Sequence, residues 1–292
     1  MGSLAYRVLS AARKRAHDHL HRAFGSSLTP EQIREIALRS FQNLVLNFLE
    51  CVHWVHSDSG ELMERMEVDG WEHVEDAYKA GLGGLFVTGH LGNWELAGAY
   101  VGLKGYPMNA VARRIYIEAL NRRLVEIRAH LGIKTLYREG SMRSMIRCLQ
   151  KNEFLAILPD QDVRRIQGIF VDFFGYPAYT PVGPALLALA SGSPILVARN
   201  IRKDGRYLLT IDAPVYANRR APREQEVRRL VTHYTKRLED FIREDPTQWV
   251  WTHRRWRTRP ELQQSPRKEM GASERRARPD HGSDGAEESS VD

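Results

Sequence analysis

The sequence has little cysteine and no long apolar run. Only two of its 292 residues are cysteines, Cys51 and Cys148, and they lie far apart without metal or redox spacing. This argues against a disulfide framework and favours a reducing compartment. No stretch reaches the roughly 18 consecutive apolar residues that predict a transmembrane helix. The start is too short and too interrupted by basic residues for a secretory signal.

Glycine-rich phosphate loops and zinc-ligand spacings are also missing, so we predict no metal and no cofactor. Basic residues are in excess, with 43 Lys and Arg against 36 Asp and Glu and a formal net charge of +7. Nucleic acid, an anionic membrane face or an acidic protein would each suit this charge, and so would an ordinary basic surface. Hydrophobic residues make up 42% of the chain, which is typical of a globular protein.

Composition divides the chain into three parts. Residues 1–28 predict a basic amphipathic segment with a possible membrane contact. Residues 29–260 predict the main globular domain. Residues 261–292 are rich in charged and small residues and predict a disordered tail.

A helix start is predicted at Thr29, with Pro30 at the first helical position and Gln32 completing a capping box. The second half of this helix, residues 41–55, is unusually apolar. It could pack in the core or touch lipid, and we favour the core because 15 residues are too few to span a bilayer.

From residue 81 onward, apolar strands alternate with helical patterns. This alternation predicts an α/β fold with a mostly parallel central sheet flanked by helices. The predicted strands are residues 84–88, 108–112, 134–137, 154–158, 169–174, 194–200 and 207–211.

The most informative local feature is the segment from Thr88 to Glu95, in which His90 precedes Glu95 by five residues. Spacing alone is weak evidence, because two other histidines precede a carboxylate in the same way. His90, however, ends a predicted buried strand, at the sheet edge where open α/β sheets bind ligands. A carboxylate in the first helical turn can fix the histidine tautomer, so we predict His90 as general base with Glu95 as partner. A pair that only caps the helix is the alternative.

Two carboxylates, Asp160 and Asp162, follow another predicted strand. They could bind a metal, orient a basic residue or cap the next turn, and the pattern alone favours capping.

The segment from Trp251 to Arg259 interleaves arginine with tryptophan. Arg254 and Arg255 would suit phosphate at a membrane interface, with the indoles at headgroup level. Single-stranded nucleic acid is a second ligand that fits, and a solvated charge run is the plain alternative.

In combination these segments resemble the bacterial lipid A biosynthesis late acyltransferases, the lauroyl/myristoyl family, which are related to the phosphatidylinositol mannoside acyltransferases. The likeness covers about residues 30–261. The motifs that carry it are Gly89-His90 to Glu95, Pro159-Asp160-Gln161, Val171 to Gly175 with Ala178 and Thr180, and Trp251 to Pro260.

The resemblance implies a glycerolipid-acyltransferase-like fold. It also implies transfer of a fatty acyl chain from acyl carrier protein or acyl-CoA to a hydroxyl of a phosphorylated glycolipid such as a lipid A precursor. His90 would be the base and Glu95 its partner, with Arg113 and Arg128 near the acceptor and the carboxylate. The substrate-binding residues expected in all are Asn93, Arg113, Arg128, Asp160, Asp162, Gly175, Thr180, Gly183, Arg254 and Arg255.

Family members usually begin with a transmembrane helix, whereas this chain begins with the basic segment. We therefore expect it at the cytoplasmic face of the inner membrane, bound peripherally to an anionic surface or through an anchor missing from this chain. A lysophospholipid or phosphatidylinositol mannoside acyltransferase is the alternative function. A protein without catalytic activity that binds membrane or nucleic acid is a second class, although we expect no nucleic acid as partner.

Overall fold

The computed structural model describes residues 1–138 and 142–260, and residues 1–259 form one compact unit. The tail predicted to be disordered, 261–292, lies outside the described residues.

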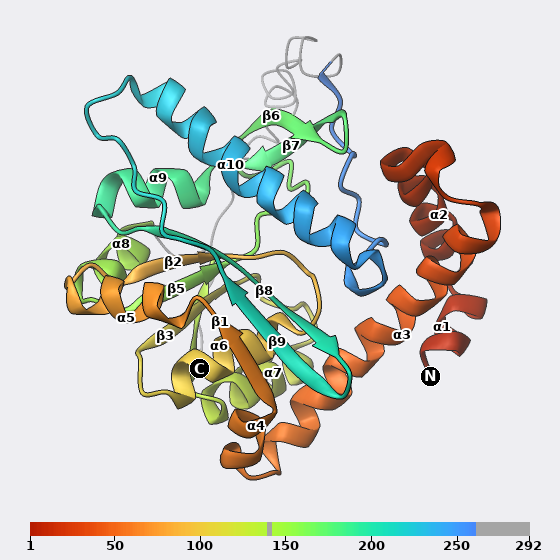
Figure 1. Cartoon of the computed structure of the whole chain (residues 1–292), viewed down its shortest axis with the longest axis horizontal. Coiled ribbons are helices and arrows are strands. Elements are labelled where there is room, and N and C mark those ends of the chain that lie inside the picture. The colour runs from red at the N-terminus through yellow and green to blue at the C-terminus, as the bar shows by residue number, and fades with distance from the viewer. Residues whose placement is uncertain (139–141, 261–292) are drawn as a thin grey trace, which may run out of the picture. The chain divides into compact units, whose positions relative to one another are not determined.

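Within the described residues, the main sheet has seven strands in the order β1-β9-β8-β2-β5-β3-β4 (Figure 1). Neighbouring strands are parallel except for β8 and β9, which are antiparallel. The α/β class with a mostly parallel sheet is thus confirmed. The bounds are β1 Met66–Asp69, β2 Gly84–Val87, β3 Met108–Ala112, β4 Ile133–Tyr137, β5 Phe154–Ile157, β8 Ile195–Lys203 and β9 Arg206–Ile211.

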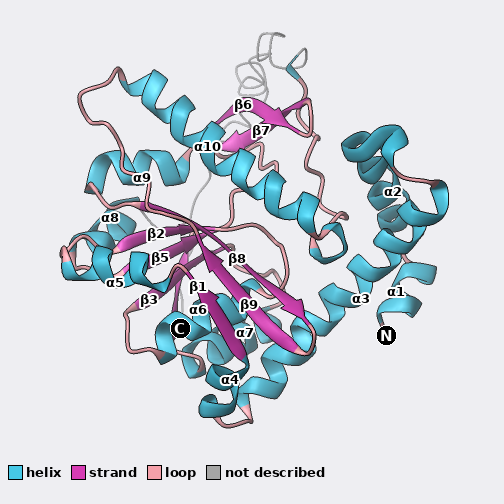
Figure 2. Ribbon diagram, viewed as in Figure 1, coloured by secondary structure: helices cyan, strands magenta, loops and turns pink. Residues whose placement is uncertain are grey.

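Helices cover both faces of this sheet (Figure 2). Because side chains alternate along a strand, Leu85 and Val87 of β2 enter one core while Phe86 enters the other. The first core contains α8 Met142–Gln150, α9 Gly183–Ser191 and α10 Arg223–Glu244. The second contains α4 Ser59–Arg65, α5 Trp71–Lys79, α6 Trp94–Leu103 and α7 Glu118–His130.

The N-terminal segment folds as α1 Gly2–Val8 and α2 Ser10–Phe24. Buried residues of α2, such as Leu20, belong to the same core as β2, and Arg15 donates a hydrogen bond to the Thr252 carbonyl at 3.0 Å. Residue 28, predicted as a boundary, therefore falls inside a compact unit. None of the helices in the described ranges combines the length and apolar character needed to cross a bilayer.

Helix α3, Pro30–Val55, begins with the predicted capping box, in which Thr29 and Gln32 exchange hydrogen bonds. One side of its apolar second half is buried and the other is exposed. Trp54 is buried, whereas Phe48 is 59% exposed. The prediction that this half packs in the core is therefore right for one side of the helix only.

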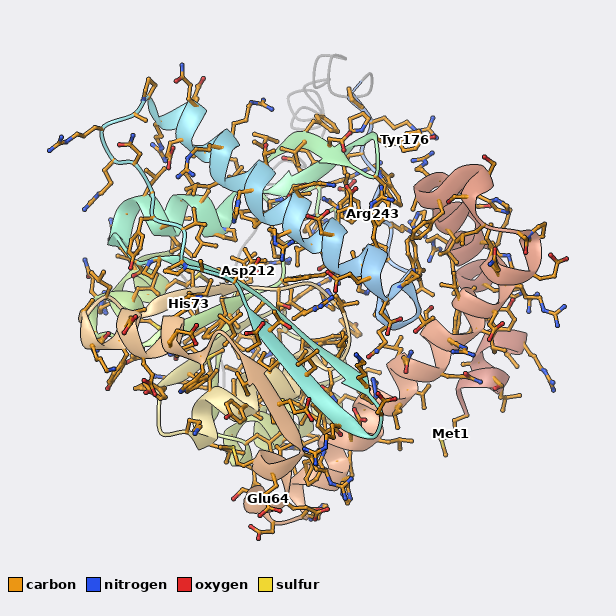
Figure 3. All side chains as sticks on the ribbon, viewed as in Figure 1. Met1, Glu64, His73, Tyr176, Asp212 and Arg243 are labelled. Atoms are coloured by element: carbon orange, nitrogen blue, oxygen red, sulfur yellow. The ribbon has the colours of Figure 1, made fainter. Side chains whose placement is uncertain are left out.

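A hairpin of β6 Gly168–Phe173 and β7 Tyr176–Pro181 packs on α10. The Phe174 amide in its turn donates to Glu239 at 2.6 Å, and the Arg243 guanidinium lies 4.4 Å from the centre of the Phe174 ring. Figure 3 labels Arg243 of α10 and Tyr176 of the hairpin. The turn is therefore held by charged groups of α10.

Candidate active site

The loop between β2 and α6 is held in place by its backbone. Gly92 donates to the Gln248 carbonyl at 3.0 Å, and Asn93 donates to the Asn200 carbonyl at 2.9 Å. Gly92 has φ +57°, and a Cβ there would lie 1.8 Å from the carbonyl oxygen of Asn200. Only glycine fits this approach of the loop to β8. Asn93 then caps α6, with its side chain accepting from the Leu96 amide at 3.3 Å.

His90 lies in this loop, and its carboxylate partner is Asp160. Nδ1 of His90 is 2.7 Å from Asp160 Oδ1, and the His90 amide donates to Oδ2 at 2.7 Å. Nε1 of Trp249 donates to the same Oδ2 at 3.0 Å. The His90 side chain is 20% exposed and that of Asp160 only 1%. The His90 ring is thus reachable while its carboxylate partner is enclosed.

Asp160 remains a carboxylate at this site. Burial acts to raise its pKa, but the charge and hydrogen bonds of His90 outweigh burial and hold the pKa well below its usual range. A charged acceptor at Nδ1 places the imidazole proton there and leaves a lone pair on Nε2. Such a ring can take a proton at Nε2 and be stabilised as imidazolium.

The predicted pairing of His90 with Glu95 is corrected by these contacts. Glu95 forms a two-pronged ion pair with Arg128, with Oε2 2.8 Å from Nε and Oε1 2.6 Å from Nη2. The reason is tertiary: Arg128 on α7 faces the first turn of α6 and takes both carboxylate oxygens. Burial lowers the pKa of Arg128, but Glu95 outweighs burial and raises it. Glu95 is therefore part of the pocket wall and not the group on the imidazole.

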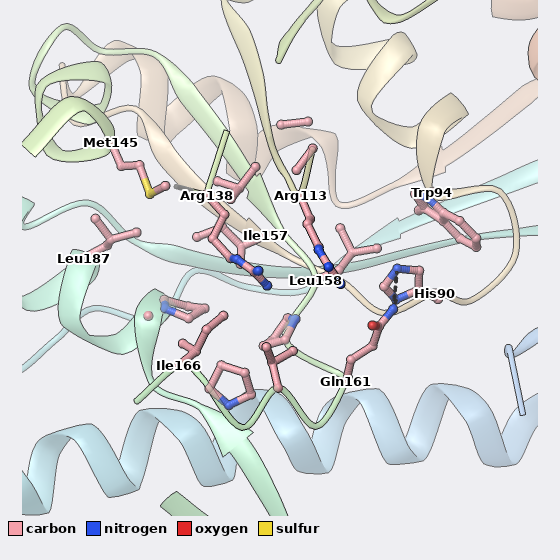
Figure 4. A pocket seen from close by; sticks show the side chains of 18 of the residues that line it. His90, Trp94, Arg113, Arg138, Met145, Ile157, Leu158, Gln161, Ile166 and Leu187 are labelled. Carbon is pink, nitrogen blue, oxygen red and sulfur yellow. Dashed lines mark hydrogen bonds between the residues drawn. The ribbon is translucent and has the colours of Figure 1, made fainter. Parts of the chain in front are cut away.

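A pocket of about 550 Å³ opens beside His90 (Figure 4). In that view His90 and Trp94 lie at one end, Met145 and Leu187 at the other, and Arg113 between them. Its wall combines apolar side chains from β3, β5, α8 and α9 with four arginines, Arg113, Arg128, Arg138 and Arg165. The site can therefore hold an apolar chain next to an anionic group.

A second histidine and a carboxamide complete the cluster. The rings of His90 and His253 have centres 4.6 Å apart and planes at 89°. Gln161 Nε2 lies 3.1 Å from Nε2 of His90. Burial, and then the charge of His90, lower the pKa of His253 to about 3, so this ring is neutral at physiological pH. Ligand atoms of His90, Asp160 and His253 lie within 4.8 Å of one another, close enough to hold a metal ion.

The predicted site residues divide into two groups. His90, Glu95, Arg113, Arg128 and Gly183 line the pocket, and Asp160 supports it from behind. Four other predicted residues hold the fold: Asn93, which caps α6; Asp162, which accepts from Thr258 Oγ1 at 2.9 Å; Thr180, which accepts from Arg255 at 2.6 Å; and Gly175, in the hairpin turn. Arg254 is exposed and lies outside the pocket lining.

The segment from Trp251 to Arg259 does not form the predicted membrane interface. Trp251 is 0% and Trp256 6% exposed, so the indoles are core residues and do not lie at headgroup level. Arg255 is 1% exposed, and its guanidinium donates to the Tyr179 carbonyl at 2.9 Å and lies 4.7 Å from the centre of the Phe173 ring. Burial lowers the pKa of Arg255 to about 10. The segment thus joins the hairpin to the core.

Sequence reasoning did not assign roles to Gln161, His253 or Trp249 as site residues. A signal was present, because Asp160 follows β5 and His90 follows β2, and the carboxyl ends of parallel strands share one sheet edge. Orientation of a basic residue, one of the three roles considered for the Asp160 carboxylate, is the role that the structure shows.

Comparison with known proteins identifies the family of the chain. Residues 1–258 match the family described as bacterial lipid A biosynthesis acyltransferase, and the chain belongs to that family. It is 26% identical to the lipid A biosynthesis lauroyltransferase of Escherichia coli K12 over 89% of this chain and 84% of that protein. It is 34% identical to the phosphatidylinositol mannoside acyltransferase of Mycolicibacterium smegmatis over 47% of this chain and 46% of that protein. The corresponding protein of Mycobacterium tuberculosis is also 34% identical, over 44% of this chain and 42% of that protein. The chain thus aligns with less than half the length of these two mannoside acyltransferases.

Proposed function

We propose that the protein is an acyltransferase that moves a fatty acyl chain from a thioester donor to a hydroxyl of a glycolipid. The observation that carries this proposal is the His90–Asp160 pair at the end of a pocket that is apolar and arginine-lined. The family membership, and the acyltransferase names of the relatives, support the same reaction class.

In the proposed reaction, Nε2 of His90 takes the proton of the acceptor hydroxyl, and the hydroxyl oxygen attacks the thioester carbonyl carbon. The carbon–sulfur bond then breaks, and the imidazolium returns the proton to the departing thiolate. Asp160 stabilises the imidazolium in between, because its carboxylate stays charged and fixed by three hydrogen bonds. His90 is thus the catalytic base, with Asp160 in the role that the sequence suggested for Glu95.

The two characters of the pocket suggest where the substrates lie. The acyl chain would lie against apolar side chains such as Met145 and Leu187. Arg113, which is exposed at the pocket, would contact a phosphate of the acceptor. Arg128 supports the wall beside it through its ion pair with Glu95.

Acyl carrier protein and acyl-CoA are the donors that fit a basic surface, and a lipid A precursor is the acceptor that we favour. A phosphatidylinositol mannoside or a lysophospholipid is the alternative acceptor. Exposed apolar residues support action at a membrane face. Tyr116, Ile117 and Leu120 are 102%, 57% and 54% exposed, and they lie in the chain between the pocket residues Arg113 and Leu124. We propose that the protein acts at an anionic membrane, at the cytoplasmic side of the inner membrane.

The test is an assay of the purified full chain with labelled acyl carrier protein or acyl-CoA. Acceptors would be a lipid A precursor, a phosphatidylinositol mannoside and lysophosphatidic acid, with products identified by mass spectrometry. The expected result is one new ester on a glycolipid, lost in His90→Ala, with His130→Ala as the control because His130 is exposed on α7. Equal product from His90→Ala would contradict the assignment of the base.

A further inference from the structure

Two segments that are far apart in the sequence run side by side next to His90. The first, 161–166, follows β5, and the second, 253–259, comes after α10. Three contacts join them: Gln161 Nε2 lies 3.3 Å from Nε2 of His253, Thr258 Oγ1 donates to Asp162 at 2.9 Å, and Arg164 donates to the Arg257 carbonyl at 3.4 Å. The two segments are therefore fixed against each other.

Exposed arginines lie on both segments, and we call these five residues the arginine rim. They are Arg164, Arg165, Arg254, Arg257 and Arg259. Arg165 also lines the pocket, together with Gln161 of the same segment, which Figure 4 shows beside His90. The rim thus borders the site where the acyl thioester would react.

The arginine rim carries positive charge without counter-ions. Within residues 1–138 and 142–260, none of its five guanidinium groups forms an ion pair with a carboxylate. The arginines of α10 differ, since Arg229, Arg237 and Arg243 each pair with an Asp or Glu at 2.6 to 2.9 Å. Like charges that lie close together repel, so an acidic partner would relieve the repulsion within the rim.

The arginine rim is also poor in apolar side chains. None of the exposed large hydrophobic residues of the described chain lies in 161–166 or 253–259. Such residues lie on α1, on α3 and in the segment 116–120, for example. Proteins bind a bilayer surface by inserting apolar side chains beside basic ones, and the rim has the basic ones alone. An acidic partner in water therefore fits the rim better than a membrane does.

The position of the rim distinguishes a protein partner from a nucleotide. Sites for small molecules are concave, and of the five arginines Arg165 alone lines the pocket beside His90. The other four carry their charge on the surface outside the pocket, on two chain segments. Charge that is spread in this way complements the surface of an acidic protein, whereas the phosphates of CoA belong to one small ligand.

We propose that the arginine rim is the docking surface for an acidic carrier protein that delivers the acyl chain as a thioester. The inference rests on the proposed acyl transfer and selects one of its two donors. Docking at the rim brings the thioester to the pocket at Arg165, on the segment that also reaches His90. The carrier protein leaves with a free thiol after the chain has moved to the acceptor.

The first experiment measures binding without turnover. The probe is acyl carrier protein with its phosphopantetheine arm and no acyl chain, titrated into the full chain by calorimetry. We expect Arg164→Glu, Arg257→Glu, which reverses one charge on each segment, to raise Kd about tenfold. The matched control is Arg219→Glu, Arg220→Glu, which reverses two exposed arginines in the loop before α10. No binding by wild type, or an equal Kd in the rim variant and the control, would overturn the docking surface.

A pair of substitutions that preserves charge separates charge from fold. Arg164→Lys, Arg257→Lys should keep the wild-type Kd within about twofold, because docking of this kind depends on charge. The Kd of wild type should also rise with added salt more steeply than the Kd of the Glu variant. A Lys variant that binds as poorly as the Glu variant would overturn electrostatic docking.

Turnover separates the docking surface from the reaction. With a lipid A precursor as acceptor, the Glu variant should raise KM for the carrier-bound donor about tenfold more than KM for palmitoyl-CoA. An equal rise for both donors would mean that the rim binds the arm they share, and would overturn the carrier protein as partner. Carrier binding that depends on the rim, without acyl transfer by any form of the protein, leaves the docking surface standing and overturns the proposed function.

Vesicles that contain phosphatidylglycerol test the membrane as the alternative partner. Sedimentation with these vesicles should be the same for the Glu variant and for the control variant, since both reverse two exposed charges. A Glu variant that loses vesicle binding relative to the control, and keeps carrier binding, would show that the rim contacts a membrane and would overturn the proposal.

Discussion

Two carboxylates flank the pocket, and they pair with different kinds of basic group. Asp160 faces the imidazole of His90, while Glu95 faces the guanidinium of Arg128. A guanidinium keeps its proton at all physiological pH values, so Glu95–Arg128 is a permanent ion pair. An imidazole can be neutral or protonated, so Asp160 supports a group that can change charge during a reaction. The partner, not the carboxylate, therefore decides which pair can do acid–base chemistry.

The largest expected effect is a loss of activity that distinguishes Asp160 from Glu95. Asp160→Asn should lower turnover by about two to four orders of magnitude. Since the His90 amide and Trp249 both donate to Oδ2, the asparagine oxygen will take that position and turn its NH₂ toward Nδ1. The imidazole proton then moves to Nε2, and the lone pair lies on Nδ1, which faces away from the acceptor. Acyl transfer kinetics measure this loss, and a loss below tenfold would show that Asp160 does not support His90 in catalysis.

Glu95→Gln should act mainly on stability. It leaves the Arg128 charge, whose side chain is 10% exposed, without its counter-ion, at a cost of about 3 kcal/mol. Urea unfolding measures the loss, and turnover of the folded fraction should stay within about tenfold of wild type. A double variant with Arg128→Met should recover part of the stability. Turnover as low as in Asp160→Asn would mean that Glu95 acts in the chemistry.

Acid should lower the free energy of unfolding first through His253, on the imidazole side of the pocket. The folded pKa of His253, about 3, lies below its ordinary value of 6.5, so the unfolded chain binds this proton more readily. The stability from a neutral His253 is therefore complete above pH 6.5 and declines as the pH falls toward 3, by about 1.4 kcal/mol per pH unit. Asp160, with its depressed pKa, adds a further loss only below the ordinary aspartate range.

The measurement is the free energy of unfolding of wild type and His253→Gln between pH 7 and pH 4. The variant should show the shallower slope, since glutamine does not titrate. Parallel slopes would show that His253 binds its proton equally in both states.

The smallest expected effect distinguishes Arg113 from Arg128, two of the four arginines in the pocket wall. Arg128 is committed to Glu95, whereas Arg113 is exposed at the pocket. Arg113→Gln should raise KM for a phosphorylated acceptor about fivefold with little change in kcat, as expected for one exposed charge-assisted contact. Arg122→Gln, also exposed but on α7 outside the pocket, is the control. An unchanged KM in Arg113→Gln would remove the phosphate contact from the proposal.

The sequence predicted what depends on neighbours along the chain. The strand before His90, the capping box at Thr29 and the α/β alternation were all local patterns, and the structure has each of them. The partner of His90 was not local. Asp160 lies 70 residues away and meets the ring because β5 pairs with β2. Glu95 is near in sequence, but a residue on another helix takes its carboxylate.

Composition gave the wrong prediction for a segment whose charged and aromatic side chains are buried. Arginine between tryptophans is the composition of a surface, yet α2 and the β6–β7 hairpin enclose Trp251, Trp256 and Arg255. A buried arginine is tolerated there because backbone and hydroxyl oxygens accept from it. Such partners come from segments remote in the chain, so a single sequence does not reveal them.

The stretch from Gln248 to His253 returns late in the chain to the base: it fixes the His90 backbone, donates to Asp160 through Trp249 and holds Gln161. During synthesis, the ribosome releases these residues only after the strands bearing His90 and Asp160. A growing chain therefore carries the reactive histidine long before it carries its supports. The His90 cluster is therefore complete only after residue 253 has been translated.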